Sequence, residues 1–395
     1  MRRKIASLLV ILVLMTVFQH GCWSRKEMNE LALALGAAVD RTPEGKYLLT
    51  LQFAKPGEFA GGVQEGGKGK VSAPVWVVSA TGKTIFEAER NLAMQVSRHI
   101  YWGHLIVLII GEKAARHGVR EVVSLFLRAP QPRETMWVMV TEGDAKNLLM
   151  SQPGLEKTSA QAIGFLARSK AGYSVELKDF TAMLASKGGE PTASRLESVK
   201  IVSTPLPSEK NPVEEVRITG VAVFKDDKLT GWLDPSETRG LLWFKGEVGK
   251  GVVTIPCPGT PEKQLSLDII RAATKVVPEY RHNKVSFTVK LMLEGDLEEE
   301  QCTEDLTKPE TVKAIEKQLQ NDIKQKVELT LNKAQGEFKA DIFGFGEAFH
   351  RAHKREWRKL KDNWNEEFAR AEVKISVEAF VRRTGLLTKP ATLRE

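Results

Sequence analysis

Hydrophobic residues recur along the chain with two periods, and these periods predict a mixture of strands and helices. A two-residue alternation runs through residues 31–39 and 47–53, on either side of the turn-forming segment 41–45. This arrangement is typical of a β-hairpin. Residues 105–110 are uninterrupted apolar residues, and a run of that length indicates a strand buried on both faces.

Apolar residues at three- and four-residue steps predict helices in the first half of the chain. Residues 81–98 carry Ile85, Ala88, Leu92 and Val96 at these steps, so we expect one helix there. Asp144 stands where it could cap a helix that begins at Ala145. Further helices are expected at 112–126, 155–170 and 177–187, and further strands at 75–79 and 136–140.

The second half begins with strands. Residues 216–224 and 229–233 flank a polar turn and predict a hairpin. Further strands are expected at 241–245, 251–255 and 285–293.

A long helix is expected from Pro309 onward. Val312, Ile315, Leu319, Ile323 and Val327 repeat along one face, and charged residues fill the rest. A coiled-coil seam is the alternative, but the chain holds fewer than four clean heptads, which favours a single amphipathic helix.

An aromatic helix and a strand close the second half. Trp357, Leu360, Trp364 and Phe368 lie on one face of the helix among basic residues. We expect this face to pack on the sheet of its own domain, and membrane or partner contact is the alternative. The strand at 373–379 alternates apolar and polar residues, which indicates one buried face.

These elements predict an α+β fold with several domains and mixed sheets packed with helices. The Pro- and Ser-rich run at 203–212 marks a linker. It separates an N-terminal α+β domain, residues 22–202, from a C-terminal α+β region, residues 213–388. The latter region could divide into two subdomains, 213–262 and 263–388.

The first 21 residues are predicted to be a signal peptide. Three basic residues precede 14 uncharged residues, 5–18, a run that is short for a membrane-spanning helix. Cys22 follows the small residue Gly21, which suggests a lipoprotein. In that case the Gly21–Cys22 bond is cleaved, the Cys22 thiol takes a diacylglycerol, and the new amino group is acylated. A short uncleaved anchor is the alternative.

Composition is that of a folded protein, with 42% hydrophobic and 27% charged residues. The net charge of +8 falls to about +5 once the three basic residues of the signal are removed and the new amino group is acylated. Such a small excess suits a position near anionic lipid headgroups. No base-stacking motif accompanies it, so we expect no nucleic-acid partner.

Two cysteines, Cys257 and Cys302, follow Cys22 in the sequence. A disulfide requires their Cα atoms to lie within about 7 Å, which the sequence does not establish. We leave the pairing open, favour unpaired cysteines, and expect no disulfide framework.

No catalytic or metal-binding constellation is expected, and no cofactor is implied. His350 and His353 share a helix face but lack the glutamate of a zinc-protease motif. Gly344 and Gly346 surround Phe345 in a predicted turn, and Asp341 could stabilise it by accepting hydrogen bonds from backbone amides. We expect the chain not to be an enzyme, and no ligand-binding residue is identified.

Several segments together resemble the Ger(x)C lipoproteins, the C subunits of nutrient germinant receptors in endospore-forming bacteria. Shorter matches are Gly103-His104 before the apolar strand, and Trp357 and Trp364. The main matching segments are GCWSRKEMNELALALGAAVD (21–40), GVAVFKDDKLTGWL (220–233) and DIFGFGE (341–347).

This resemblance implies a Ger(x)C-like fold in a lipoprotein needed for spore germination. Its lipid, through Cys22, would tether it to the outer face of the cell membrane, the inner membrane of the spore. Its implied partners are the two integral-membrane subunits of the receptor. We expect a non-enzymatic scaffold or coupling subunit. The alternative is a solute-binding lipoprotein that captures the germinant directly, for which two α/β lobes around a cleft would be typical.

Overall fold

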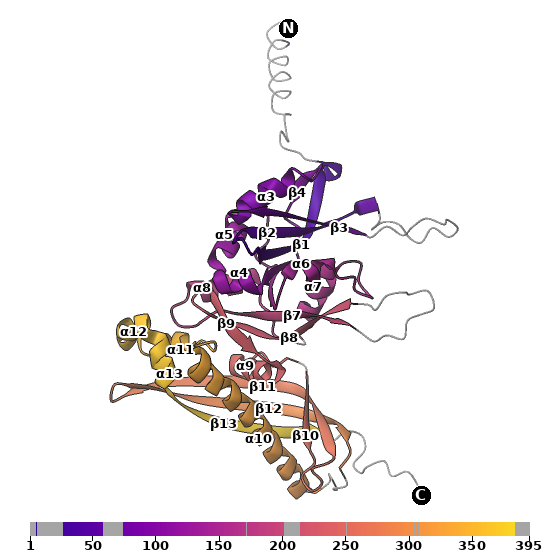
Figure 1. Cartoon of the computed structure of the whole chain (residues 1–395). Helices are drawn as coiled ribbons and strands as arrows, with labels where there is room; N and C mark the ends of the chain where they lie inside the picture. The colour runs from indigo at the N-terminus through magenta and orange to yellow at the C-terminus, as the bar shows by residue number, and fades with distance from the viewer. Residues whose placement is uncertain are drawn as a thin grey trace, which may run out of the picture.

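The computed structural model describes residues 27–57, 74–170, 172–200, 214–249, 251–302 and 308–383, together with residues 5 and 305. Two mixed sheets, each packed with helices, form the described part of the chain (Figure 1). The predicted α+β class, with mixed sheets and helices, is therefore confirmed.

The first sheet combines antiparallel strands at its two edges with parallel strands at its centre. Its order is β3-β2-β1-β5-β6-β7-β8-β9, and β4 pairs with β1. Strands β1, β5, β6 and β7 are parallel, whereas β1-β2-β3 and β7-β8-β9 are antiparallel. The bounds are β1 Leu31–Arg41, β2 Tyr47–Ala54, β3 Val75–Gly82, β4 His99–Tyr101, β5 Val107–Gly111, β6 Trp137–Thr141, β7 Thr192–Lys200, β8 Glu214–Lys225 and β9 Lys228–Leu233.

Helices cover both faces of this sheet, as its central strand requires. In β5, Leu108 and Ile110 pack with α3, α4, α5 and α8, whereas Val107 and Ile109 pack with α6 and α7. The prediction of a strand buried on both faces is confirmed, as is the hairpin formed by β1 and β2. The helices are α3 Ile85–Ala93, α4 Glu112–His117, α5 Arg120–Arg128, α6 Ala145–Met150, α7 Ser159–Ser169 and α8 Leu177–Ala185.

Two predicted helices in this half have different bounds in the structure. The helix expected at 81–98 is shorter because β3 continues to Gly82 and Thr84 caps α3, accepting a hydrogen bond from the Glu87 backbone N–H. The helix expected at 112–126 is divided into α4 and α5. Gly118, with φ 143°, ends α4, and the Val119 N–H turns to the Asp227 carbonyl oxygen.

The start of α6 is capped by a different residue from the one predicted. Asp144 occupies the N-cap position, but its side chain makes no capping hydrogen bond. The buried carboxylate of Asp40, at the end of β1, accepts instead from the Ala145 N–H (2.7 Å) and the Lys146 N–H (3.0 Å). A residue 105 positions away thus satisfies two orphan donors of the helix start.

The second sheet is built around one long antiparallel hairpin. Its order is β10-β11-β12-β13, with β13 parallel to β12. His282 and Asn283 both have positive φ, as a two-residue hairpin loop requires. Strand β11 was not among the strands predicted from the sequence. The bounds are β10 Val252–Pro256, β11 Gln264–Arg281, β12 Lys284–Glu300 and β13 Glu372–Arg383.

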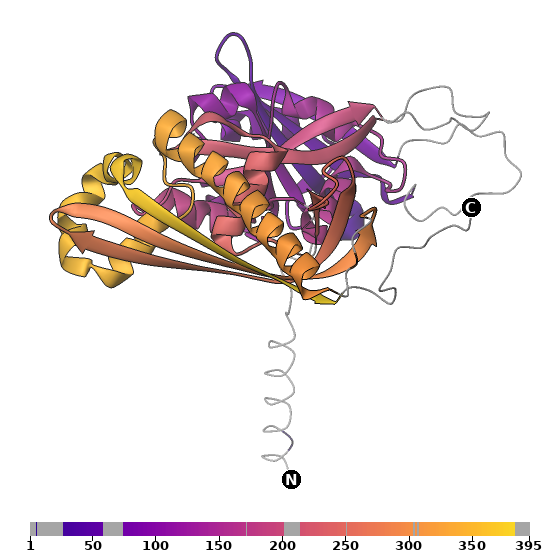
Figure 2. The same ribbon diagram turned by 90° about the horizontal axis from the view of Figure 1, so that it is seen from below.

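One face of the second sheet is covered by the C-terminal helices. The predicted amphipathic helix is confirmed as α10, which buries Ile315, Leu319, Ile323 and Val327. It crosses the sheet obliquely, while α11 to α13 gather at one end (Figure 2). The predicted aromatic helix is divided by a 3-10 turn, but its aromatic residues are buried as expected. The bounds are η1 Met28–Glu30, α10 Pro309–Lys333, η2 Ala334–Phe338, α11 Phe345–Ala352, α12 Lys354–Leu360, η3 Lys361–Asn363 and α13 Trp364–Arg370.

The strand expected at 241–245 is wrong, because these residues belong to helix α9 (Pro235–Lys245). Asp234 and Glu237 form a capping box, and Pro235 occupies the first turn. These start signals select a helix. The apolar run 241–244 resembles a strand in sequence, but its side chains are buried on all sides of the helix because α9 lies between the two sheets.

Helix α9 makes the core continuous from one sheet to the other. Leu241, Trp243 and Phe244 share one cluster with residues of both sheets. Strands β8 and β9, which follow the predicted linker, pair into the first sheet, and β10 pairs into the second. The linker itself, 203–212, lies outside the described residues, and the domain boundaries stay predictions.

Cys257 and Cys302 form a disulfide, which corrects the preference for unpaired cysteines. The Cα atoms lie 5.6 Å apart, and both residues are buried. Cys257 follows β10 and Cys302 follows β12. Because β11 pairs with both strands, their ends converge in space, which sequence distance could not reveal.

We predict that replacing both cysteines with alanine lowers the free energy of unfolding. Cross-linking residues 45 positions apart restricts the unfolded chain, and loss of such a bond typically costs about 2–5 kcal/mol. Denaturant titration of both proteins, with and without reductant, measures the change. Reductant should destabilise the natural protein only, and equal stability of the two proteins would contradict the prediction.

Candidate functional site

The predicted lipidation and cleavage residues, Cys22 and Gly21, lie outside the described residues, so both modifications stay predictions. The described fold begins close to them in the chain. Glu27 follows Cys22 by five residues. Even a fully extended chain therefore keeps the two Cα atoms within about 18 Å of each other.

A groove of about 1300 Å³ lies at this end of the fold. It is bordered by η1, α3, β4 and the end of α5, on the side of the first sheet away from the second sheet (Figure 1). Its lining includes Asn29 and Glu30, only a few residues after Glu27. The start of the fold and the groove therefore occupy the same end of the molecule.

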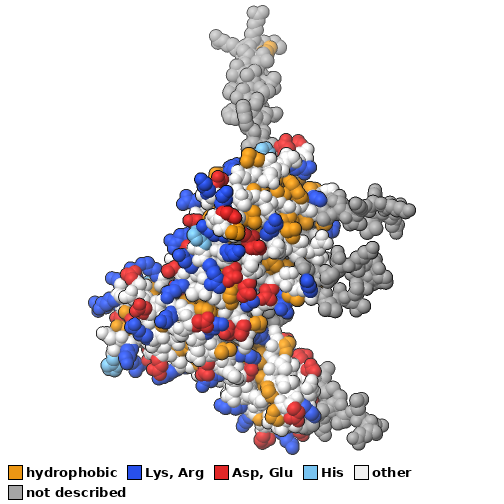
Figure 3. All heavy atoms as spheres, viewed as in Figure 1, with side chains coloured by type: hydrophobic (Ala, Val, Ile, Leu, Met, Phe, Trp, Pro, Cys, Tyr) orange, Lys and Arg blue, Asp and Glu red, His pale blue; other side chains and the backbone are white. Residues whose placement is uncertain are grey.

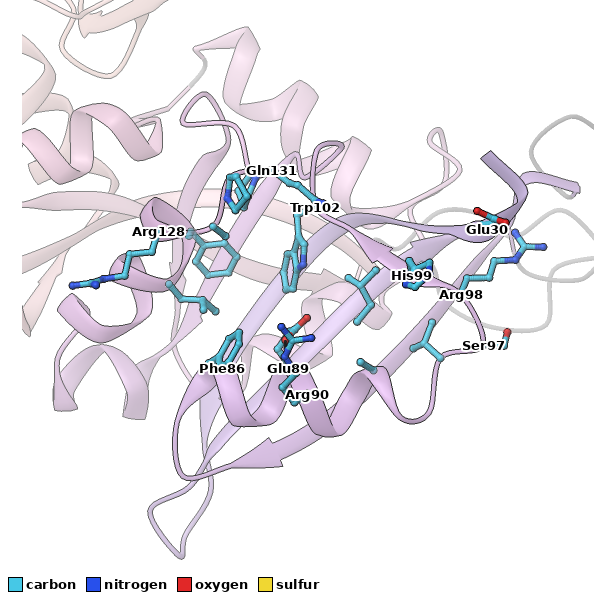
Figure 4. A pocket seen from close by; sticks show the side chains of 18 of the residues that line it. Glu30, Phe86, Glu89, Arg90, Ser97, Arg98, His99, Trp102, Arg128 and Gln131 are labelled. Carbon is cyan, nitrogen blue, oxygen red and sulfur yellow. Dashed lines mark hydrogen bonds and ion pairs between the residues drawn. The ribbon is translucent and has the colours of Figure 1, made fainter. Parts of the chain in front are cut away.

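The floor of the groove is apolar and firmly packed. Trp102 and Phe126 meet edge to face, with ring centroids 5.8 Å apart. The Trp102 backbone N–H donates to the Gln131 side-chain oxygen, which fixes the loop that closes one side. Figure 4 shows Phe86 projecting from α3 on the side facing Trp102. The floor of the groove is therefore a preformed apolar surface.

Charged side chains surround this floor. Arg90 lies over the Phe86 ring at 4.7 Å and pairs with Glu89 at 3.3 Å. Burial raises the pKa of the Glu89 carboxyl, and the charge of Arg90 opposes that rise. In Figure 4, Arg128 lies at one end of the groove and Arg98 at the other. The site combines an apolar floor with cations at both ends.

The second notable feature is a buried junction around Asp341. Its carboxylate is fully buried and accepts the Trp364 indole N–H at 2.9 Å. It also accepts the backbone N–H groups of residues 343–346 at 2.7–3.1 Å. Gly344 adopts φ 77°, as predicted, and the predicted role of Asp341 is confirmed, whereas Gly346 lies in the first turn of α11. Burial raises the pKa of the Asp341 carboxyl, and these hydrogen bonds oppose the rise.

The segment between α8 and β7 docks onto this turn. The Glu190 backbone N–H donates to the Asp341 carbonyl oxygen at 2.7 Å, and the Glu347 N–H donates to the Gly188 carbonyl oxygen. The Glu190 carboxylate accepts from the Asp226 N–H and the Asn365 amide. The junction therefore joins the first sheet to the helices of the second.

The two histidines pack against aromatic rings, and His353 lies just beyond the end of α11 as its C-cap. His350 stacks on Trp357, with ring centroids 5.3 Å apart, and His353 lies beside Phe349 and Tyr280. Across the described residues, no group of three metal-ligating side chains comes together. Within the same ranges, no helix combines the length and apolarity needed to cross a bilayer.

Sequence reasoning missed the groove and the partner of the Asp341 turn. The groove is assembled from residues as far apart as Asn29 and Pro132, which no local pattern connects. A usable signal for the junction was the Gly188-Gly189 pair, because adjacent glycines before a strand indicate close backbone approach.

Comparison with known proteins assigns both parts of the chain to spore germination families. The family described as "Spore germination protein N-terminal domain" matches residues 24–198. The family described as "Spore germination B3/ GerAC like, C-terminal" matches residues 219–385. The interval between the two matches contains the predicted linker.

Similar proteins are matched over nearly their full length. Spore germination protein KC of Bacillus subtilis (strain 168) is 29% identical over 396 residues, covering 97% of each chain. Spore germination protein B3 of the same organism is 26% identical over 398 residues, covering 98% of this chain and 100% of that protein. The crystal structure of the GerBC protein, 21% identical, superposes with a TM-score of 0.53 over 88% of this chain and 97% of that one.

These matches define an α+β spore germination protein with paired N-terminal and C-terminal family regions. The chain belongs to the Ger(x)C family, which confirms the resemblance found in the sequence. The GerBC likeness independently supports the fold.

We predict that Gly188→Ala destabilises the junction and Gly189→Ala does not. A Cβ at position 188 would lie 2.6 Å from the Glu347 backbone nitrogen, whereas a Cβ at 189 would meet Gly344 at 3.4 Å. Overpacking of this kind costs about 1–3 kcal/mol. Denaturant titration measures both variants, and equal stabilities would show that the backbone contact does not constrain the junction.

Proposed function

We propose that this protein is a lipid-anchored subunit of a spore nutrient germinant receptor, needed for germination. It is held by Cys22 at the outer face of the cell membrane, which is the inner membrane of the spore. It assembles there with the two integral-membrane subunits of the receptor. Its role is that of a non-enzymatic scaffold that couples these subunits.

The junction around Asp341 is the observation that carries the coupling role. Together with α9 it joins the two sheets through the hydrogen bonds of Gly188 and Glu190 and through one continuous core. A displacement at one end is therefore transmitted to the other as motion of a rigid body, because packed cores do not deform continuously. A scaffold needs this property to relay a change between partners.

Anchoring supports the scaffold role through effective concentration. Cys22 precedes the described fold by only five residues, so the lipid would confine the protein to a thin layer beside its partners. Confinement makes association effectively intramolecular, and modest interfaces then suffice. The names of the relatives, which are spore germination proteins, support an assembly in the spore.

Direct capture of the germinant is the alternative function. A solute-binding lipoprotein is typically built from two α/β lobes around a cleft. The groove could accept a solute, but the second sheet consists of antiparallel β10, β11 and β12 with β13, without repeated βα units. This architecture favours the scaffold.

We predict that Cys22→Ala releases the full-length protein from spore membranes and abolishes the response to nutrients. Without the thiol there is no site for the diacylglycerol, so the chain carries no covalent lipid to hold it at the membrane. Membrane fractionation and nutrient-triggered germination of spores measure both effects. Ser24→Ala, two residues further on, is the matched control and should leave both unchanged. Unaltered retention and response in the Cys22 variant would refute the tether.

We predict that the fragment 23–395 gives no specific heat of binding with amino acid or sugar germinants. This fragment retains the fold from η1 to β13. Isothermal titration calorimetry makes the measurement, and a thermal shift with each germinant provides a second readout. Saturable binding of one germinant would favour capture over the scaffold role.

A further inference from the structure

The groove beside α3 exposes apolar side chains at its border as well as in its floor. Phe86, which lines it, is 52% exposed, and the neighbouring Leu127 and Met94 are 45% and 79% exposed. Figure 3 shows hydrophobic side chains on this end of the molecule with Lys and Arg beside them. Clustered exposed apolar surface of this kind marks a site of association.

Cations at both ends of the groove are available to an anionic ligand. Arg98 and Arg128 are exposed, and neither forms an ion pair within the described ranges. Arg128 donates to the Ser124 hydroxyl oxygen, which leaves its remaining N–H groups toward solvent. A phosphate is a good partner for such groups because guanidinium donors match its oxygens.

The position of the groove indicates which anion it would meet. Glu30, in its lining, follows Cys22 by eight residues, so an extended chain separates their Cα atoms by at most about 29 Å. A lipid on Cys22 would therefore hold the groove near the headgroups of the same membrane. Its volume of about 1300 Å³ also exceeds the roughly 300–1,000 Å³ of ordinary small-molecule pockets.

We propose that this groove docks on the membrane by binding an anionic phospholipid. The phosphate contacts Arg98 or Arg128, and the apolar floor with Phe86 receives the upper part of an acyl chain. Basic residues at the margin and aromatic residues at the interface are the side chains that favour such a surface. The proposal rests on the proposed membrane anchoring, which brings the groove to the lipid and which the groove contact would orient.

The test uses the fragment 23–395, which lacks Cys22 and so cannot be lipidated. Its binding is measured by flotation with vesicles of pure phosphatidylcholine and of an equal mixture of phosphatidylcholine and phosphatidylglycerol. We expect binding to the mixed vesicles and little to the neutral ones. The double variant Arg98→Gln/Arg128→Gln should bind the mixed vesicles about 30-fold more weakly, since each basic residue at an anionic surface contributes about fivefold.

A matched control removes the same charge elsewhere. Arg281→Gln/Lys284→Gln alters the two strand ends that flank the loop between β11 and β12, on the second sheet. This variant should bind like the unmodified fragment if the groove, rather than net charge, makes the contact. A Phe86→Gln variant should lose the binding that persists at high salt, because salt screens the arginines but not apolar insertion.

Each outcome decides the proposal. If the groove variant and the control variant lose binding equally, net charge alone attracts the fragment and docking by the groove is refuted. Absence of binding by the unmodified fragment would also overturn the proposal. Normal vesicle binding by the groove variant, combined with failed germination of spores that carry it, would assign the groove to a protein partner and refute the lipid. The vesicle results are obtained without Cys22, so failure of docking there and failure of the tether are separate findings.

Discussion

The arrangement of the molecule depends on one buried carboxylate, that of Asp341. Desolvation of a carboxylate is costly, and here five N–H donors offset that cost. Four of these donors are consecutive backbone amides, so the charge imposes the shape of the turn before α11. The fifth belongs to Trp364 and ties the turn to α13. The backbone of Gly188 approaches this turn so closely that a Cβ at position 188 would lie 2.6 Å from the Glu347 nitrogen.

Two separate ends result from this arrangement. The groove lies on the first sheet on the side away from the second sheet, near the residues that follow the predicted lipidation sequence. The second sheet, with α10 and its disulfide, lies at the opposite end. Because a continuous core and the Asp341 junction connect them, contact with a membrane at one end and with proteins at the other would belong to a single body.

Local signals in the sequence predicted much of this fold. The hairpin β1-β2, the doubly buried β5 and the long helix α10 each follow from a period that a short segment carries by itself. The Asp341 turn was also predictable, because four of its donors lie within five residues of the carboxylate. Non-local features were not: Asp40 caps a helix 105 residues away, and the groove combines residues from Asn29 to Pro132. The prediction of a strand at 241–245 was wrong because it gave the hydrophobic run more weight than the capping box of Asp234 and Glu237, which starts a helix.

The parallel pairing of β13 with β12 determines when the second sheet can be completed. β12 ends at Glu300 and β13 begins at Glu372, so their contacts join segments that are distant in the chain. Contacts of high sequence separation form slowly, because the entropy lost on closing the long intervening loop must be overcome first. Cys302, in contrast, is synthesised before α10 and β13. Its disulfide with Cys257 could therefore covalently join the ends of β10 and β12, on either side of β11, before β13 has been synthesised.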